Sequence, residues 1–388
     1  MRTPRTTLVA ALAASLVLIG SACGSTGETV STDTTAIPAA TNAFAYAEPG
    51  PYPVGITTLS LPTGNKVEVW YPATEGTSGS DAYDMRDFVP EAVRALLTAD
   101  VDATFTIDAG RDAAAADERF PVVLFSHGFS GIRYQSSFLT SHLASWGMVV
   151  AAPDHPSRDL ASQLGGGATP TDPVDDMAGT LTLLEAENNA GGVLSGTMNF
   201  DHVGLVGHSA GGGTVLAYAT SPAVDGYVSL ASGARLGPDA EAGDTPTLPG
   251  KPSFFMAGTT DAVVPPETRT RPAFEAAPAP SLLWILEGVG HNGFDDFCTF
   301  GNGRGIIGVA EASGLGGLLD AVPQLKALGA DGCGPPSVPV DETFPVINHA
   351  VTSWLRSLFG VDSEPVGLGP EVADSYTVPV EIVVKARQ

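Results

Sequence analysis

Residues 202–213 read HVGLVGHSAGGG, a stretch in which a short apolar run ends at a serine surrounded by glycines. The run from Val203 to Val206 has the composition of a buried strand, and the residues after Ser209 are typical of a helix start. Glycines at positions 207 and 211 fit a sharp turn in which strand, turn and helix approach one another closely. Such a turn would lift the serine above the carboxyl edge of a sheet, at a helix amino terminus whose dipole favours developing negative charge. Ser209 is therefore a candidate nucleophile.

Short apolar runs of the same kind recur on both sides of this stretch. They lack in-out alternation, which indicates strands buried on both faces, and helix-like stretches separate them. Strands that alternate with helices favour right-handed crossovers and a mostly parallel sheet, and thus an α/β fold. The predicted strands are 121–128, 148–153, 202–207, 226–232, 252–258 and 281–288, and the predicted helices are 88–98, 132–146, 174–189, 210–220, 264–276 and 343–359.

Two further segments have a strand pattern. VGITTLSL from Val54 and the following KVEVWYP flank Pro-Thr-Gly-Asn, which predicts an antiparallel hairpin. The tail contains YTVPVEIVV (376–384), a strand-like run to which the sequence assigns no neighbour.

The charge balance narrows the range of partners. The chain of 388 residues carries 43 Asp and Glu against 18 Lys and Arg, a formal net charge of −25. An acidic surface repels nucleic acid and anionic lipid headgroups, so we expect no nucleic-acid partner. The charge is compatible with a neutral or apolar small-molecule substrate, and the alternative is that it mainly keeps the protein soluble. We expect a monomer.

The amino-terminal residues have the pattern of an export signal. Two arginines precede an apolar stretch from Leu8 to Gly20, which is too short to span a bilayer comfortably. IGSAC follows and resembles a bacterial lipobox, in which Cys23 would be lipidated; simple signal cleavage is the alternative. We therefore expect an exported protein, either a cell-surface lipoprotein held to the membrane only through Cys23 or a secreted one. The expected segments are a signal peptide (1–22), a flexible tether (23–50), a catalytic domain (51–360) and a tail (361–388).

Two cysteines remain after the signal, Cys298 and Cys333. In an exported chain two cysteines favour one disulfide, and two free buried thiols are the alternative.

A serine hydroxyl needs a base that a third group orients, and in this kind of sheet the chain order is serine, acid, histidine. Asp261 in MAGTTDAVVPP follows a predicted strand, and His291 in EGVGHNGF follows the next one. Among rivals, His349 lies within a predicted helix, and Asp225 precedes a strand instead of following it. The predicted triad is Ser209, Asp261 and His291.

Catalysis also requires donors for the oxyanion. The backbone N–H of Ala210 is one candidate, and that of Phe129 in FSHGFSG, which ends an earlier strand, is the other. His208 lies inside the turn, where we expect it to pack or to hydrogen-bond without a chemical role. His155 is a candidate either for the substrate pocket or for a structural role, and Trp284 is a second pocket candidate.

The pentapeptide Gly207–Gly211 matches Gly-x-Ser-x-Gly, the nucleophile elbow of the α/β-hydrolases. Together with FSHGFSG, LASWGMVVAAPDHPSRD, GHNGFDDF and VEVWYPA, it resembles the platelet-activating-factor acetylhydrolase-like branch of that fold, close to bacterial polyester hydrolases and cutinase-like esterases. The resemblance runs from about Val54 to Phe359 and implies the same triad and oxyanion donors.

Two features depart from the resemblance. Polyester hydrolases usually have a tryptophan after the strand that follows the nucleophile helix, whereas VSLASGAR has no aromatic residue. Residues 299–342 form a Gly-rich insertion after His291, and GVAEASGLGGLLDAVPQLKALG within it has a partly apolar helical pattern. We expect this insertion to be a cap that restricts the acyl or alcohol pocket; packing away from the pocket is the alternative.

These patterns predict an exported serine ester hydrolase acting through an acyl-enzyme on short or medium acyl, lipid-like or aromatic esters, with polyesters as a further candidate substrate. The chain has no metal-spaced His/Cys cluster and no Gly-x-Gly-x-x-Gly after a strand, so we expect no metal and no organic cofactor. The first alternative is an acyltransferase that uses the same triad on a cell-envelope acceptor. A binding lipoprotein on an inactive hydrolase fold and a peptidase rank lower, and dienelactone hydrolase chemistry would favour a cysteine at position 209.

Overall fold

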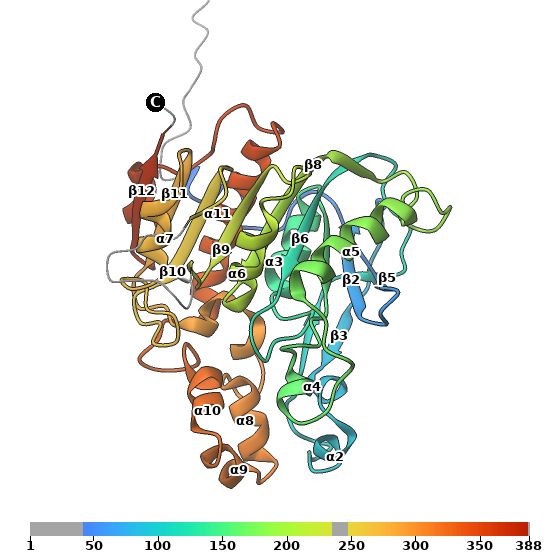
Figure 1. Cartoon of the computed structure of the whole chain (residues 1–388), viewed down its shortest axis with the longest axis vertical. Helices are drawn as coiled ribbons and strands as arrows, with labels where there is room; N and C mark the ends of the chain where they lie inside the picture. Colours follow the sequence, from blue (N-terminus) through green and yellow to red (C-terminus); the bar gives the residue numbers. More distant parts are fainter. Residues whose placement is uncertain (1–41, 235–246, 387–388) are drawn as a thin grey trace, which may run out of the picture. The chain divides into compact units, whose positions relative to one another are not determined.

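The computed structural model describes residues 42–234 and 247–386, which form a ten-stranded sheet covered by helices (Figure 1). The strand order is β12-β11-β10-β9-β8-β6-β7-β2-β1-β5. The strands from β11 to β7 pair in parallel, whereas β2 joins β7 and β12 joins β11 in antiparallel fashion. The strands are β1 (Val54–Ser60), β2 (Lys66–Pro72), β5 (Gly110–Arg111), β6 (Phe120–Ser126), β7 (Val149–Pro153), β8 (Met198–His208), β9 (Gly226–Leu230), β10 (Ser253–Gly258), β11 (Ser281–Leu286) and β12 (Val380–Lys385). The predicted α/β architecture is confirmed.

Two apolar cores lie on the two faces of this sheet. The helices α3 (Ser137–Ser145) and α11 (Val340–Leu358) contribute to one core and contact each other. The helices α5 (Pro173–Glu187), α6 (Ala210–Tyr218) and α7 (Thr270–Ala276) contribute to the other. Because both faces are covered, every residue of β6, β10 and β11 is buried, which explains their continuous apolar runs.

The structure corrects three predicted helices. Within the segment predicted as a helix over 88–98, the only α-helix is the short α2 (Glu91–Arg94), and Pro90 separates it from the preceding turn η1 (Met85–Phe88). The helix predicted over 264–276 begins at Thr270, since Pro265 and Pro266 favour extended backbone before them. The helix predicted over 132–146 likewise begins later, at Ser137.

The remaining elements are short. A separate two-stranded antiparallel sheet, which the sequence did not indicate, pairs β3 with β4. The insertion after His291 folds into three short helices that lie together at the lower edge of Figure 1. These elements are β3 (Asp81–Asp84), β4 (Thr104–Ile107), α4 (Leu160–Gln163), η2 (His291–Phe294), η3 (Asp296–Cys298), α8 (Gly305–Ala312), α9 (Gly316–Asp320), α10 (Pro323–Ala330) and η4 (Pro370–Ser375).

The two ends of the described chain both contact the domain. Tyr46, which we assigned to the tether, is buried, and its hydroxyl donates to Asp362 over 2.6 Å, so the folded part begins before residue 51. The tail contributes β12, which extends the sheet beside β11. The predicted signal peptide, Cys23 and the tether up to residue 41 lie outside the described residues. Among the helices that the structure describes, none combines the length and the apolar character needed to cross a membrane.

Candidate active site

The turn after β8 is a strained strand-to-helix connection. Ser209 has φ 54° and ψ −121°, a backbone conformation that costs a non-glycine residue about 1–3 kcal/mol. A Cβ on Gly207 would lie 2.3 Å from the carbonyl oxygen of Gly211, and a Cβ on Gly211 would lie 1.9 Å from that of Ser126. Only glycine fits at either position, which is the physical reason for the motif around Ser209.

The structure brings the three predicted triad residues into one hydrogen-bonded chain. Asp261 follows β10, and its Oδ2 lies 2.8 Å from Nδ1 of His291. Nε2 of His291 lies 2.9 Å from Oγ of Ser209. Because a carboxylate only accepts hydrogen bonds, Nδ1 carries the proton and Nε2 is free to accept the hydroxyl proton of Ser209. The other oxygen of Asp261 accepts the N–H groups of Val263 and Val264, which fixes the carboxylate.

Two backbone donors flank the serine. Ala210 is the first residue of α6, so its N–H has no acceptor within that helix. The loop after β6 passes directly beside the nucleophile, since a Cβ on Gly128 would lie 3.1 Å from Cβ of Ser209. Among the described residues, the N–H of Phe129 has no backbone acceptor. Both predicted oxyanion donors therefore lie next to Ser209 with their N–H groups available.

A buried glutamine that sequence reasoning missed joins these loops. Gln135 accepts the N–H of Gly128 over 2.7 Å, and its amide nitrogen donates to His208 over 2.7 Å and to Asp295 over 2.9 Å. His208 in turn donates from Nε2 to the carbonyl oxygen of His291. Burial lowers the pKa of His208 and raises that of Asp295. This buried network thus positions the oxyanion loop relative to the histidine loop.

The two pocket candidates named from the sequence have structural roles. His155 is fully buried and lies between Ser126, whose Oγ is 2.9 Å from Nε2, and Asp176, whose Oδ2 is 2.9 Å from Nδ1. Trp284 points into the core beneath β11, where it packs against Phe254 and Tyr376. Both side chains are buried, and neither is among the described residues that line the two cavities at Ser209.

Arg158 was not singled out from the sequence, although it lies at the centre of this region. Its guanidinium donates to the carbonyl oxygens of His127 and Ala210, and to the hydroxyls of Ser126 and Thr214. Burial lowers its pKa to about 10, so the side chain stays charged at neutral pH. One cation therefore holds the oxyanion loop against the start of the nucleophile helix.

His349, the rival candidate for the catalytic base, forms its hydrogen bonds with residues outside the predicted triad. It is buried in α11, accepts the N–H of Tyr46 at Nδ1 and donates from Nε2 to the carbonyl oxygen of Gly367. Burial lowers its pKa to about 4, so it is a neutral packing residue.

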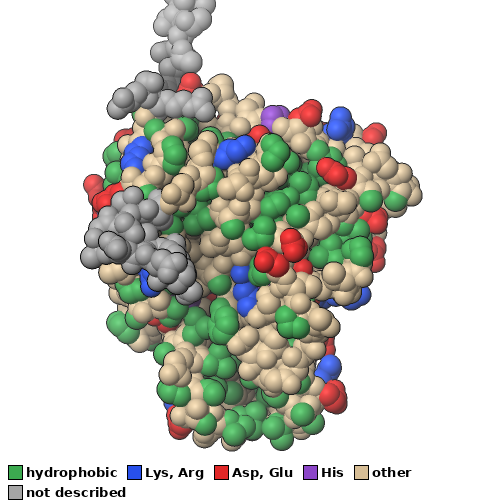
Figure 2. All heavy atoms as spheres, in the orientation of Figure 1, with side chains coloured by type: hydrophobic (Ala, Val, Ile, Leu, Met, Phe, Trp, Pro, Cys, Tyr) green, Lys and Arg blue, Asp and Glu red, His purple; other side chains and the backbone are tan. Residues whose placement is uncertain are grey.

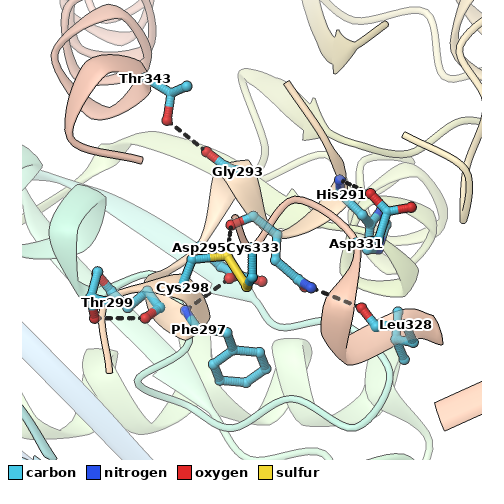
Figure 3. The surroundings of a disulfide bond; sticks show 12 residues. His291, Gly293, Asp295, Phe297, Cys298, Thr299, Leu328, Asp331, Cys333 and Thr343 are labelled. Atoms are coloured by element: carbon cyan, nitrogen blue, oxygen red, sulfur yellow. Dashed lines mark hydrogen bonds between the residues drawn. A yellow bond between two sulfur atoms is a disulfide. The ribbon is translucent and has the colours of Figure 1, made fainter. Parts of the chain in front are cut away.

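The insertion is fastened to the histidine loop (Figure 3). Cys298 and Cys333 form a disulfide, and Asn292 donates to the carbonyl oxygen of Leu328 over 2.8 Å. On the opposite side of the loop, Thr343 of α11 donates to the carbonyl oxygen of Gly293. The predicted base therefore lies on a loop that is tied at several points.

Asp331, which follows α10 in the insertion, contacts the loops of both the acid and the base. Its Oδ1 accepts the N–H of His291 over 2.8 Å, as Figure 3 shows, and its Oδ2 accepts the N–H of Ala262 over 2.9 Å. Ala262 follows Asp261 directly, so one carboxylate spans the two loops that must align for the Asp261–His291 hydrogen bond. No sequence motif marks this residue.

Two cavities meet at Ser209. The first has a volume of about 180 Å³ and lies between the insertion helices and the segment around α2. The second has a volume of about 1100 Å³, lies beside α6 and the loop after β10, and is more open. Figure 2 shows hydrophobic side chains gathered over the insertion helices, next to the first cavity.

Comparisons with known proteins show which families and solved structures this chain resembles. The family model of platelet-activating factor acetylhydrolase, isoform II, matches residues 50–164, and that of chlorophyllase matches residues 113–258. Chlorophyllase-1 from Arabidopsis thaliana is 33% identical over 152 residues, which make up 37% of this chain. The chain spans 45% of the length of that curated relative.

A solved structure extends the likeness over most of the chain. A ferulic acid esterase from Streptomyces cinnamoneus superposes with a TM-score of 0.52 at 18% sequence identity, and the match covers 80% of this chain and 92% of that one. The predicted resemblance is confirmed: the chain has the α/β-hydrolase fold and resembles the acetylhydrolases and esterases of that fold.

Proposed function

We propose that this protein is a serine carboxylic-ester hydrolase. The observation that carries the proposal is the hydrogen-bonded chain from Asp261 through His291 to Ser209, which ends at a strained serine where two cavities meet. The names of the matched proteins include an acetylhydrolase and an esterase, which supports the same chemistry.

In the proposed reaction each residue has a role. Ser209 Oγ attacks the ester carbonyl while His291 Nε2 takes its proton, and Asp261 holds the imidazole and stabilises its positive charge. The oxyanion of the tetrahedral intermediate accepts hydrogen bonds from the N–H groups of Phe129 and Ala210. His291 then gives its proton to the leaving alcohol, and the acyl group stays on Ser209. Water attacks this acyl-enzyme with His291 again as the base, and the carboxylic acid is released.

The first test is the hydrolysis of p-nitrophenyl esters by the wild type and by Ser209→Ala. Removal of the nucleophile of such a triad cost about 10⁶ in turnover in a well-studied protease, so we expect a loss of at least about 10³ here. Thermal unfolding of both proteins checks that the variant is folded. A folded wild type that cleaves no ester, or a variant that retains full activity, would contradict the proposal.

We propose in addition that the protein is exported and held at the membrane through Cys23, on the basis of the charged, apolar and small-residue segments of residues 1–23. The disulfide is compatible with an oxidising compartment. Fractionation of cells that express the wild type or Cys23→Ala tests this, because loss of the lipid should move the protein out of the membrane fraction. A wild type found in the cytosol would rule the idea out.

A further inference from the structure

The first cavity is built from two segments that are far apart in the sequence. One wall consists of residues around η1 and α2, and the opposite wall comes from the insertion helices α8, α9 and α10. The polar residues that line it lie in the catalytic loops around Ser209, and the parts farther away are lined by aliphatic and aromatic side chains. One end of the cavity therefore contains the polar residues of the catalytic loops, and the other end is apolar.

Charge is absent from this lining, although the chain has a formal net charge of −25. No Asp, Glu, Lys or Arg is among the described residues around the first cavity. A charged substrate group would lose its hydration there without gaining a partner, which costs several kcal/mol. The cavity therefore suits an uncharged hydrocarbon group.

The apolar character continues to the surface. Large hydrophobic side chains rarely stay exposed without a reason when they cluster. Several of the exposed ones in the described chain line this cavity, namely Leu96 (51% exposed), Phe129 (47%), Leu318 (60%) and Val322 (44%). An apolar group can thus pass from solvent to Ser209 along a hydrophobic path.

The position of His291 decides which half of the ester this cavity receives. In ester cleavage the leaving alcohol oxygen must come within hydrogen-bond reach of the imidazole nitrogen that returns the proton. His291 lines the first cavity and is not among the residues that line the second. The alcohol side of the scissile bond therefore points toward the first cavity.

The second cavity has a different lining. It contains Ala210, with its available N–H group, and polar residues such as Gln163, Thr220 and Gln324. Arg269 is the one charged residue among the described residues that line it. This larger and more polar space suits the acyl side of the ester.

We propose that the first cavity is an alcohol-binding site, and that the preferred substrates are esters of uncharged, hydrocarbon-like alcohols whose acyl part is short or polar. This inference rests on the proposed ester hydrolysis and defines its substrate class. It also gives the insertion a role, since about half of the apolar wall belongs to residues 305–329.

Isomeric esters test the division directly. Hexyl acetate and ethyl hexanoate have the same composition and nearly the same hydrophobicity, but they carry the six-carbon chain on opposite sides of the ester bond. We expect kcat/KM for hexyl acetate to exceed that for ethyl hexanoate by about tenfold or more, since each buried methylene contributes to binding. Acid release in a pH-stat measures both.

A variant that fills the cavity identifies the site. Ala310 lines the first cavity, so Ala310→Phe should lower kcat/KM for hexyl acetate by about tenfold more than it lowers kcat/KM for ethyl acetate. Ala312, on the same helix, is exposed and lines neither cavity, so Ala312→Phe is the matched control. Val93→Trp narrows the cavity from the opposite wall, in case Ala310→Phe fails to fold.

The outcomes separate the two proposals. A preference for ethyl hexanoate that Ala310→Phe removes would assign the cavity to the acyl chain and overturn the inference. Equal use of both isomers, unchanged in both filling variants, would also overturn it, because the cavity would then bind neither chain. A folded wild type that cleaves neither isomer nor any p-nitrophenyl ester would refute ester hydrolysis itself.

Discussion

The molecule contains two Ser–His–Asp chains with nearly the same hydrogen-bond lengths. In one, His291 lies 2.9 Å from Ser209 and 2.8 Å from Asp261. In the other, His155 lies 2.9 Å from both Ser126 and Asp176. Both histidines are buried, and in both the ring nitrogen that faces the aspartate carries the proton.

The surroundings of the two serines differ. Ser126 lies within β6, is fully buried, and its Oγ already accepts a hydrogen bond from Arg158 over 2.8 Å. Ser209 lies on the strained turn beside two available N–H groups, and it lines both cavities. A hydrogen-bonded Ser–His–Asp set is therefore not enough for catalysis. The serine must also be accessible to substrate and lie beside donors for the oxyanion. We call the set Ser126–His155–Asp176 the inner chain and the set Ser209–His291–Asp261 the outer chain. The inner chain holds the end of β6, from which the oxyanion loop begins.

The largest difference is expected from the matched changes Asp261→Asn and Asp176→Asn. The loss of the triad carboxylate lowered turnover about 10⁴-fold in a protease, because the histidine then takes the wrong tautomer, and we expect a similar loss for Asp261→Asn. Asp176→Asn should leave kcat within about threefold. Esterase assays on both folded variants measure this, and a comparable loss in the two would mean that the inner chain takes part in catalysis.

Residues that follow recognisable strand ends could be predicted from the sequence. Ser209, Asp261 and His291 each lie in the loop or turn that follows a buried apolar run, and the structure brings them together. The inner chain was not predicted, because Ser126 has no glycine elbow and because its histidine precedes its aspartate. His155 could be assigned to packing only when its two partners were known.

Other positions escaped sequence reasoning because their roles depend on long-range contacts. Gln135 contacts Asp295, 160 residues away, and Arg158 contacts Ala210, 52 residues away. A glutamine or arginine in a loop carries no local signal of such a role. The insertion was predicted as a cap. The sequence did not show that Asp331 joins the loops of Asp261 and His291, or that residues around α2 form the wall of the first cavity opposite the insertion.

A smaller effect on turnover is expected from a change at Asp331, whose carboxylate joins the loops of His291 and Asp261. Asn at this position keeps one acceptor and loses the other, so one of the N–H groups of His291 and Ala262 would lose its partner. We expect Asp331→Asn to lower kcat by roughly tenfold to a hundredfold with little change in KM, since small displacements of catalytic groups are costly.

Asp320 provides the control for Asp331, because it is exposed in the same insertion and pairs with Lys326. Asp320→Asn should match the wild type. If Asp331→Asn lowers the melting temperature but keeps the wild-type kcat, the carboxylate is structural and does not position the triad.

The smallest effect concerns the inner chain alone and appears as a pH dependence of stability. Burial raises the pKa of Asp176 from 3.8 to about 6, so the folded protein keeps a proton that the unfolded chain releases between these values. This contribution to stability is fully present below about pH 4 and is lost as the pH rises through about 6. Asparagine does not titrate, so the free energy of unfolding of the wild type should fall relative to Asp176→Asn by at most about 3 kcal/mol between pH 4 and pH 7.

Urea unfolding at several pH values measures the difference, with the exposed Asp175→Asn as the control. A difference that does not change with pH would mean that folding does not raise the pKa of Asp176.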